Sequence, residues 1–154
     1  MENEINELSF TEIGGILPLL EFLAENDDKK SKYFGGIGMY PTEPFEQTIS
    51  EISKEVENGY SKIDVVKNNN RIIGFTQYAI KNSIGELKYL VMLPEYKNQG
   101  YGKLLIERAI NYFKTKQIKR IDLGVVYRND NAKIFYEKYG FKTSALIMSL
   151  NMEV

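Results

Sequence analysis

A strand, a glycine-containing turn and a long amphipathic helix follow one another between residues 86 and 116, and this succession constrains the fold most. Glu86 to Leu93 reads as a strand that Pro94 stops. Gly100 to Lys116 reads as a helix, because its apolar residues recur at helical spacing. The free backbone N–H groups and the dipole at the start of such a helix attract anions. The segment therefore predicts an anion site where the strand passes into the helix.

The rest of the chain predicts an α+β domain around a mixed sheet. Alternating or continuous apolar runs indicate further strands at residues 5–8, 63–66, 71–80, 121–126 and 145–152, and the asparagines at 68–70 indicate a hairpin turn. Helices are expected after Thr11, from Pro44 through Val56, and over 131–139. Residues 31–43 are expected to form a glycine-containing loop. No repeat or linker is evident, so residues 1–154 are expected to form a single domain.

Two residue types are missing, and their absence restricts the chemistry. The 154 residues include no histidine and no cysteine, which excludes catalytic triads, imidazole bases, thiol nucleophiles and zinc sites built on these ligands. We therefore expect no metal. No apolar run approaches the roughly 18 residues of a membrane span, and no secretory leader is evident at the start. A cytoplasmic protein is expected, without a membrane partner.

Charge is distributed unevenly along the chain. The net charge is −1, which gives no general attraction to nucleic acid. Residues 1–28 hold eight acidic and no basic side chains, whereas residues 95–142 hold eleven basic and five acidic ones. The two regions could be ordinary solvated faces. Alternatively, an anionic cofactor binds near the basic half and a cationic substrate near the acidic half.

Two common nucleotide-binding motifs do not fit the turn. A G-x-x-x-x-G-K-[ST] loop needs a glycine where Lys97 stands and a hydroxyl where Leu104 stands. A G-x-G-x-x-G fingerprint needs a third glycine where Leu105 stands. In addition, residues 94–99 separate the strand from the first glycine, whereas that fingerprint follows its strand directly. Both alternatives fail on spacing.

The same turn resembles the pyrophosphate-binding motif of the GNAT acetyltransferases, a Q/R-x-x-G-x-G/A segment after a strand that ends near V-x-P. Lys97 stands where Gln or Arg is usual, which keeps the charge. The resemblance implies that backbone amides of the turn bind the pyrophosphate of acetyl-CoA, and that the backbone of the strand pairs with the pantetheine arm. The implied cofactor-binding residues are Val91, Met92, Lys97, Asn98, Gln99, Gly100, Tyr101, Gly102 and Lys103.

A second stretch resembles the C-terminal signature of the same family, N-x-x-A-x-x-x-Y-E-x-x-G-F. Here it begins at Asn129 and runs through Ala132 and Tyr136 to Phe141. The resemblance implies a mostly antiparallel mixed sheet of six to seven strands flanked by about four helices. It is clear over about residues 63–142 and thin over the first sixty. The family often dimerises through its C-terminal strands, which leaves a homodimer open.

The resemblance also implies roles for single residues. Tyr136 is the expected general acid beside the CoA sulfur, and Glu86 occupies the position of the base in histone-acetylating members. Two alternatives to this role of Glu86 stay open. The amine proton could be lost through water, or Glu86 could be an ordinary exposed glutamate at the start of a strand. Asn129 is expected to orient the cofactor or to cap the loop before the last helix. Tyr33, Phe34 and Tyr40 fall in the variable acceptor-binding region.

These expectations combine into one function. The chain is expected to be an acetyl-CoA-dependent N-acetyltransferase that passes the acetyl group directly to a primary amine, since no cysteine can carry an acetyl intermediate. The acceptor is expected to be a small cationic amine, and the donor could be a longer acyl-CoA. Two alternatives stay open: an acyl-CoA-binding sensor of the same fold without turnover, and an interaction domain whose glycine turn is structural.

Overall fold

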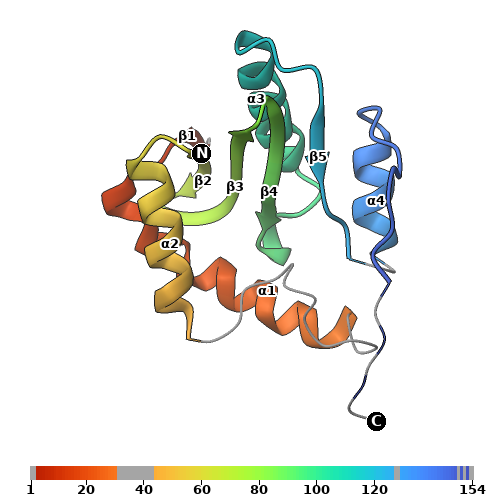
Figure 1. Ribbon diagram of the computed structural model, residues 1–154. Helices are drawn as coiled ribbons and strands as arrows, with labels where there is room; N and C mark the ends of the chain where they lie inside the picture. The colour runs from red at the N-terminus through yellow and green to blue at the C-terminus, as the bar shows by residue number, and fades with distance from the viewer. Residues whose placement is uncertain (1–2, 31–43, 127–128, 149, 151, 153–154) are drawn as a thin grey trace.

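The chain folds into one mixed sheet with helices on both of its faces (Figure 1). The structure is a computed structural model that describes residues 3–30, 44–126, 129–148, 150 and 152. Its elements, in chain order, are β1 (Glu4–Glu7), the 3-10 helix η1 (Phe10–Ile16), α1 (Leu17–Lys30), α2 (Phe45–Glu57), β2 (Ser61–Asn68), β3 (Arg71–Lys81), β4 (Ile84–Met92), the 3-10 helix η2 (Pro94–Tyr96), α3 (Tyr101–Thr115), β5 (Ile121–Leu123) and α4 (Asp130–Glu137).

The strands lie in the order β1-β2-β3-β4-β5. The first four pair antiparallel with their neighbours, and β5 alone is parallel to β4. A parallel pair needs a long crossover, and α3 supplies it between β4 and β5. The predicted α+β class with a mostly antiparallel sheet is confirmed. The described residues form five strands and four α-helices, against the six to seven strands expected.

Two tight turns build the centre of the sheet. Asn69 and Asn70 have φ angles of 50° and 68° between the paired ends of β2 and β3. Asn82 and Ser83, with φ angles of 52° and 64°, join β3 to β4 in the same way. Two consecutive positive φ values suit the right-handed twist of a hairpin, and asparagine tolerates them better than most residues. The hairpin predicted from residues 68–70 is therefore confirmed.

Apolar side chains fill both sides of the sheet. On one side η1, α1 and α2 cover the strands, where Ile16, Leu19 and Phe75 are fully buried. On the other side α3 covers β3 and β4 through Ile106 and Phe113. Figure 1 shows α2 beside β2 and α4 beyond β5, at opposite ends of the sheet. The sheet thus leaves a region between these two helices that α1 crosses at one end.

The first helical segment and the helix after Pro44 differ in detail from the prediction. The helix expected from Thr11 starts as η1 and becomes α-helical at Leu17. Pro18, at the second position of α1, is tolerated there because the first turn needs no N–H donor. Pro44 is the N-cap of α2 with extended backbone, rather than a residue of its first turn.

The C-terminal end is where the sequence prediction was wrong. β5 covers residues 121–123 instead of 121–126, and none of the described residues of 145–152 forms a strand. Leu146 and Met148 are 81% and 91% exposed. An alternating apolar pattern shows which face a strand would bury, but a strand also needs a neighbour for its backbone hydrogen bonds. No described strand lies beside this segment. The loop expected at residues 31–43 lies outside the described residues.

Candidate active site

A cleft of about 630 Å³ lies between α2 and α4, over the strands that join them. This volume is that of a small-molecule site. One wall comes from α2, the floor from β3 and β4, and the far wall from β5, the chain after it and α4. Its lining includes the charged residues Glu51, Glu55, Lys81, Glu86, Lys88 and Asp122, with Gln77, Tyr89, Val91, Asn129 and Tyr136.

The cleft exists because β4 and β5 part. They pair at three positions only, Gly85 with Ile121, Glu86 with Asp122 and Leu87 with Leu123. β4 continues to Met92, whereas the chain after Leu123 leaves the sheet, and both diverging segments line the cleft. Beyond Leu87, no described strand pairs with that edge of β4. Backbone groups on an open edge can bond a ligand as they would bond a strand.

A β-bulge at Lys88 shapes the floor. Gln77 of β3 pairs with Tyr89, but the next residue, Tyr78, pairs with Leu87, so Lys88 has no partner on β3. A bulge bends its strand and re-aims side chains. The Lys88 ammonium group reaches Glu55 of α2, and the Tyr89 ring contacts Phe75 on the same face. This bulge could not be predicted from the residues of β4, because it depends on how β4 pairs with β3.

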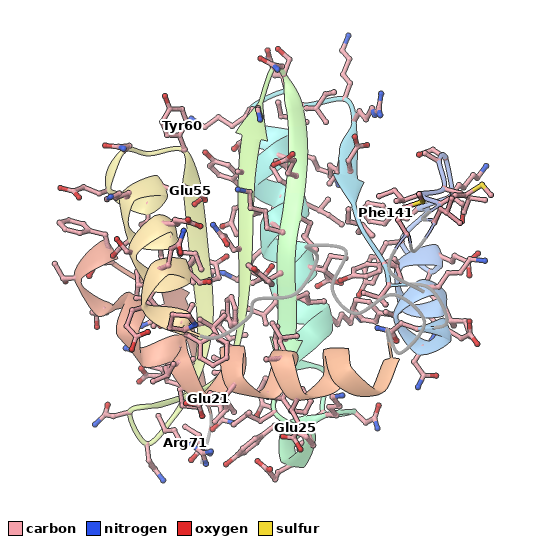
Figure 2. The ribbon with its side chains drawn as sticks, turned by 60° about the horizontal axis from the view of Figure 1, so that its bottom comes forward. Glu21, Glu25, Glu55, Tyr60, Arg71 and Phe141 are labelled. Atoms are coloured by element: carbon pink, nitrogen blue, oxygen red, sulfur yellow. The ribbon has the colours of Figure 1, made fainter. Side chains whose placement is uncertain are left out.

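Glu55 is the centre of a polar network between α2 and the sheet, and Figure 2 shows it on the sheet side of α2. Its Oε1 atom accepts from the Lys88 Nζ atom at 3.0 Å. Its Oε2 atom accepts from Gln77 Nε2 at 2.8 Å and from the Ser61 hydroxyl at 3.4 Å. Gln77 is 1% exposed, and its Oε1 atom has no donor among the described residues. This network was not predicted from the sequence, although Gln77 is a polar residue within the apolar run of β3.

The phenol of Tyr89 lies near the same helix. Burial raises the pKa of Tyr89 above its usual value, and the negative charges of Glu55 and Glu51 raise it further. The phenol therefore stays protonated at neutral pH. Tyr89 keeps a hydrogen-bond donor in the cleft.

Glu86 lies where the sequence predicted it, near the start of β4 in a half-buried position. It pairs across the sheet with Ala79 and, in the parallel direction, with Asp122. Its side chain lines the cleft, so it is placed to meet a ligand there.

Tyr136 enters the same cleft from α4. Aromatic neighbours hold its ring, since Phe135 and Phe141 lie 5.3 Å and 5.8 Å away between ring centroids. Such edge-on ring contacts orient an aromatic side chain. Asn129 is the N-cap of α4, and its Oδ1 atom accepts from the Ala132 backbone N–H at 3.4 Å. Asn129 thus caps the helix itself rather than the loop before it, and it also lines the cleft.

The predicted anion site is the start of α3. Its N-cap is Gly100 with φ 88°, a left-handed conformation that favours glycine, and no side chain caps the helix. The Leu104 N–H donates to the Gly100 carbonyl at 3.2 Å. The N–H groups of Tyr101, Gly102 and Lys103 come before this first turn closes and have no helical acceptor. An uncapped helix start of this kind fits a phosphate group.

The remaining cofactor-binding candidates occupy two different settings. Val91 lines the cleft, whereas the Met92 side chain lies in the core beside Gly74. The residues from 97 to 103 do not line the cleft itself. The exposed turn residues among them are Lys97, Asn98, Gln99, Gly100 and Lys103.

The helix start is nevertheless close to α4. A Cβ atom at Gly102 would lie 3.7 Å from the Phe135 ring, in ordinary contact. The Tyr101 hydroxyl accepts from the Asn3 side chain at 2.6 Å, and Lys97 Nζ lies 5.4 Å from the centre of the Phe22 ring. The side chains of Tyr101 and Lys97 therefore also contact the N-terminal part of the chain.

Three further expectations concern the acceptor, metal ions and membranes. Tyr33, Phe34 and Tyr40, expected at the acceptor, lie outside the described residues. Within the ranges that the structure describes, no group of three or more acidic, histidine or cysteine side chains could hold a metal ion. None of the described helices is both long and apolar enough to span a bilayer.

The sequence model of the acetyltransferase (GNAT) family matches residues 21–141. A spermidine N(1)-acetyltransferase of Thermoplasma acidophilum is 30% identical over 115 residues, which cover 68% of this chain and 71% of that protein. A [ribosomal protein bS18]-alanine N-acetyltransferase of Haemophilus influenzae is 37% identical over 73 residues, 47% of this chain and 49% of that one. A relative from Bacillus subtilis is matched over 60% of its length. The chain thus spans between about half and three fifths of the last two relatives.

A solved structure has the same fold. The paiA N-acetyltransferase of Thermoplasma acidophilum, in complex with coenzyme A, superposes with a TM-score of 0.69 at 25% identity, over 94% of this chain and 92% of that one. The match to the family model confirms the resemblance of the two motifs. The chain belongs to the acetyltransferase (GNAT) family.

Proposed function

We propose that the protein is an N-acetyltransferase that uses acetyl-CoA to acetylate a primary amine by direct transfer, and that residues 1–154 act as one catalytic domain. One observation carries the proposal: Glu86, Val91 and Tyr136, predicted from separate parts of the sequence, line one cleft where β4 and β5 part. Family membership supports the reaction class. The coenzyme A in the paiA structure supports the choice of cofactor.

The residues present fit this cofactor. The uncapped start of α3 offers backbone N–H groups for the pyrophosphate, with Lys97 and Lys103 adding positive charge. The open edge of β4 at Val91 and Met92 offers backbone groups to an amide-containing arm. When bound, acetyl-CoA supplies an acetyl group activated as a thioester.

Side chains of the protein then carry out two proton transfers. In the transfer a C–N bond forms, a C–S bond breaks and the amine loses one proton. We assign the amine proton to the Glu86 carboxylate and the protonation of the departing sulfur to the Tyr136 hydroxyl. Asn129 holds the start of α4 and thereby the position of Tyr136. Backbone donors in the cleft stabilise the negative charge that develops on the carbonyl oxygen.

The acceptor is proposed to be a small cationic amine. Four carboxylates, those of Glu51, Glu55, Glu86 and Asp122, line the cleft with two lysines. The spermidine acetyltransferase relative supports this acceptor class, whereas the ribosomal-protein relative supports a protein amine. Tyr33, Phe34 and Tyr40 stay candidates for acceptor contacts. The homodimer also stays a prediction, which analytical ultracentrifugation tests.

The direct test is release of free thiol from acetyl-CoA in the presence of a panel of amines and of peptides with a free N-terminus. The proposal predicts amine-dependent thiol release and acetylated amine by mass spectrometry. Tight acetyl-CoA binding without turnover on any acceptor would instead identify an acyl-CoA sensor.

A further inference from the structure

The floor of the cleft contains a buried hydrogen-bond acceptor with no donor. Gln77 lines the cleft from the centre of β3 and is 1% exposed. Its Oε1 atom has no partner in the part of the chain that the structure describes. A buried acceptor left without a donor is unfavourable, and native proteins rarely keep one without a reason. A ligand in the cleft that offers N–H groups would supply the missing donor.

The orientation of the Gln77 amide follows from its neighbours. Its Nε2 atom donates to Glu55 Oε2 at 2.8 Å and to the Ser61 hydroxyl at 3.1 Å. The reversed amide would place its oxygen against the Glu55 carboxylate, which offers no proton when ionised. The Nε2 atom of Gln77 is therefore already bonded within the network, and the Oε1 atom is left for another donor.

The wall above Gln77 is negatively charged. Glu51 and Glu55 lie one helical turn apart on α2, and both line the cleft. Both also raise the pKa of Tyr89, the residue that pairs with Gln77, so their charges act at this point of the cleft. Lys88 is paired with Glu55, whereas Glu51 is paired with no cation among the described residues and accepts only from the neutral Gln47 amide.

The two carboxylates and the amide oxygen together determine which chemical group can bind here. All three groups accept hydrogen bonds, and two carry negative charge, so a carboxylate or phosphate is disfavoured here. A protonated amine offers three N–H donors and one positive charge. The site thus fits an ammonium group.

The position of this site differs from that of Glu86, the proposed acceptor of the amine proton. Glu86 pairs with Ala79, and Gln77 is two residues away along β3, about 7 Å at the usual rise of a strand. An ammonium group at Gln77 is therefore a second nitrogen of the acceptor. An alkyl chain of about four methylene groups bridges such a distance.

We propose that Gln77, Glu51 and Glu55 form a subsite for the second nitrogen of the acceptor, so that the acceptor class is alkyl diamines and polyamines. The proposal rests on the proposed acetyl transfer in the same cleft. The subsite predicts that the enzyme binds acceptors with two positive charges more tightly than acceptors with one. The first amine lies at the transfer point, and the second binds at Gln77 on the floor of the cleft.

The test compares butane-1,4-diamine with butan-1-amine as acceptors in steady-state kinetics. The parent should use the diamine with a KM about tenfold or more lower, the difference expected from one hydrogen bond to a charged group. Gln77→Met, which removes the amide, and Glu51→Gln, at an exposed position, should each raise the diamine KM about tenfold. In both variants the KM for the diamine should rise more than the KM for the monoamine, so that the ratio of the two KM values approaches one. Glu57→Gln on α2, outside the cleft lining, is the matched control and should match the parent.

Equal KM values of the parent for the two amines would overturn the subsite, as would variants that raise both KM values alike. A second measurement separates the subsite from the transfer reaction. Calorimetric titration with butane-1,4-diamine, without acetyl-CoA and below the melting temperature of both proteins, should show binding by the parent and at least tenfold weaker binding by Gln77→Met. Equal binding by the two proteins would contradict the subsite. If the parent binds the diamine but acetylates no amine, the subsite stands and the proposed function fails.

Discussion

Leu87 of β4 and Leu123 of β5 form the last parallel pair between these strands, and the cleft opens directly after them. Glu86 stands just before this point, and Val91 stands beyond it on the open edge. α4 then brings Tyr136 to the other side of the same opening. The separation of two strands thus gathers residues that are up to 50 positions apart in the chain.

Tyr136→Phe removes the hydroxyl and keeps the ring that packs against Phe135 and Phe141. If the hydroxyl protonates the departing sulfur, kcat should fall by about 100-fold. The affinity for acetyl-CoA, measured by calorimetry, should change much less. Tyr139→Phe, just beyond the end of α4 and outside the cleft lining, is the control and should keep full activity. An unchanged kcat in Tyr136→Phe would remove Tyr136 from the mechanism.

Glu86→Gln removes a carboxylate from the cleft and keeps the size of the side chain. If Glu86 accepts the amine proton, kcat/KM of the parent falls at acidic pH as this carboxylate becomes protonated. The variant has no carboxylate there, so the acidic limb of its pH–rate profile should shift. The profile of the variant is compared with that of the parent over the same pH range. The same acidic limb in both proteins would favour proton loss through water.

Gly74→Ala tests the packing beneath the open edge of β4. A Cβ atom at Gly74 would lie 2.0 Å from Met92 Sδ and 3.0 Å from the Val91 carbonyl oxygen. The buried Met92 side chain must move, so we expect a loss of about 1–3 kcal/mol in the free energy of unfolding. Gly14→Ala, where a Cβ atom meets nothing within 4 Å, is the control. Chemical denaturation measures both, and equal stabilities would show that the strand edge adapts freely.

The buried hydroxyl of Tyr78 affects how the free energy of unfolding changes at alkaline pH. Its hydroxyl donates to Asp64 Oδ2 at 2.8 Å, and Asp64 Oδ1 accepts from Arg108 of α3 at 3.1 Å. Burial raises the pKa of Tyr78 well above its usual value, and the negative charge of Asp64 raises it further. The folded protein therefore retains this proton at a pH where the unfolded chain has lost it.

The sign of the effect follows from proton counting. Above pH about 10, the folded state binds the Tyr78 proton and the unfolded state does not, so the free energy of unfolding falls by about 1.4 kcal/mol per pH unit for this group. Tyr89, with its pKa also raised by burial, acts in the same direction. Below pH about 10 neither group contributes a slope. Tyr78→Phe should reduce the slope of stability between pH 10 and 11.5, measured by urea denaturation; an unchanged slope would contradict the assignment.

The sequence was sufficient for the elements whose signals are local. The asparagines at 68–70 predicted the β2–β3 hairpin, and Gly100 with the apolar spacing after it predicted α3. Asn129 was predicted as a cofactor ligand or as a cap of the loop before α4, and it caps the helix itself. These features depend on φ angles and periodicity within a few residues, which the residue types themselves determine.

Features that depend on distant neighbours were missed or wrong. The bulge at Lys88 arises from the pairing of β3 with β4, and the bond between Gln77 and Glu55 arises when α2 packs on the sheet. The strand expected at residues 145–152 has the right alternation but no described neighbour to pair with. Its apolar pattern could not reveal this, because pairing is a tertiary property.

Calorimetric titration with acetyl-CoA measures whether the start of α3 binds the pyrophosphate of the cofactor. Gly102→Glu adds bulk and negative charge at the helix start, and Gly14→Glu makes the same exchange at an open, exposed position far from it in the chain. Gly102→Ala is a fold control, because its Cβ atom makes only an ordinary contact with Phe135. If the pyrophosphate binds there, we expect micromolar binding by the parent and by Gly14→Glu, and no measurable binding by Gly102→Glu. Absence of binding by the parent, or equal binding by Gly102→Glu, would contradict this binding site.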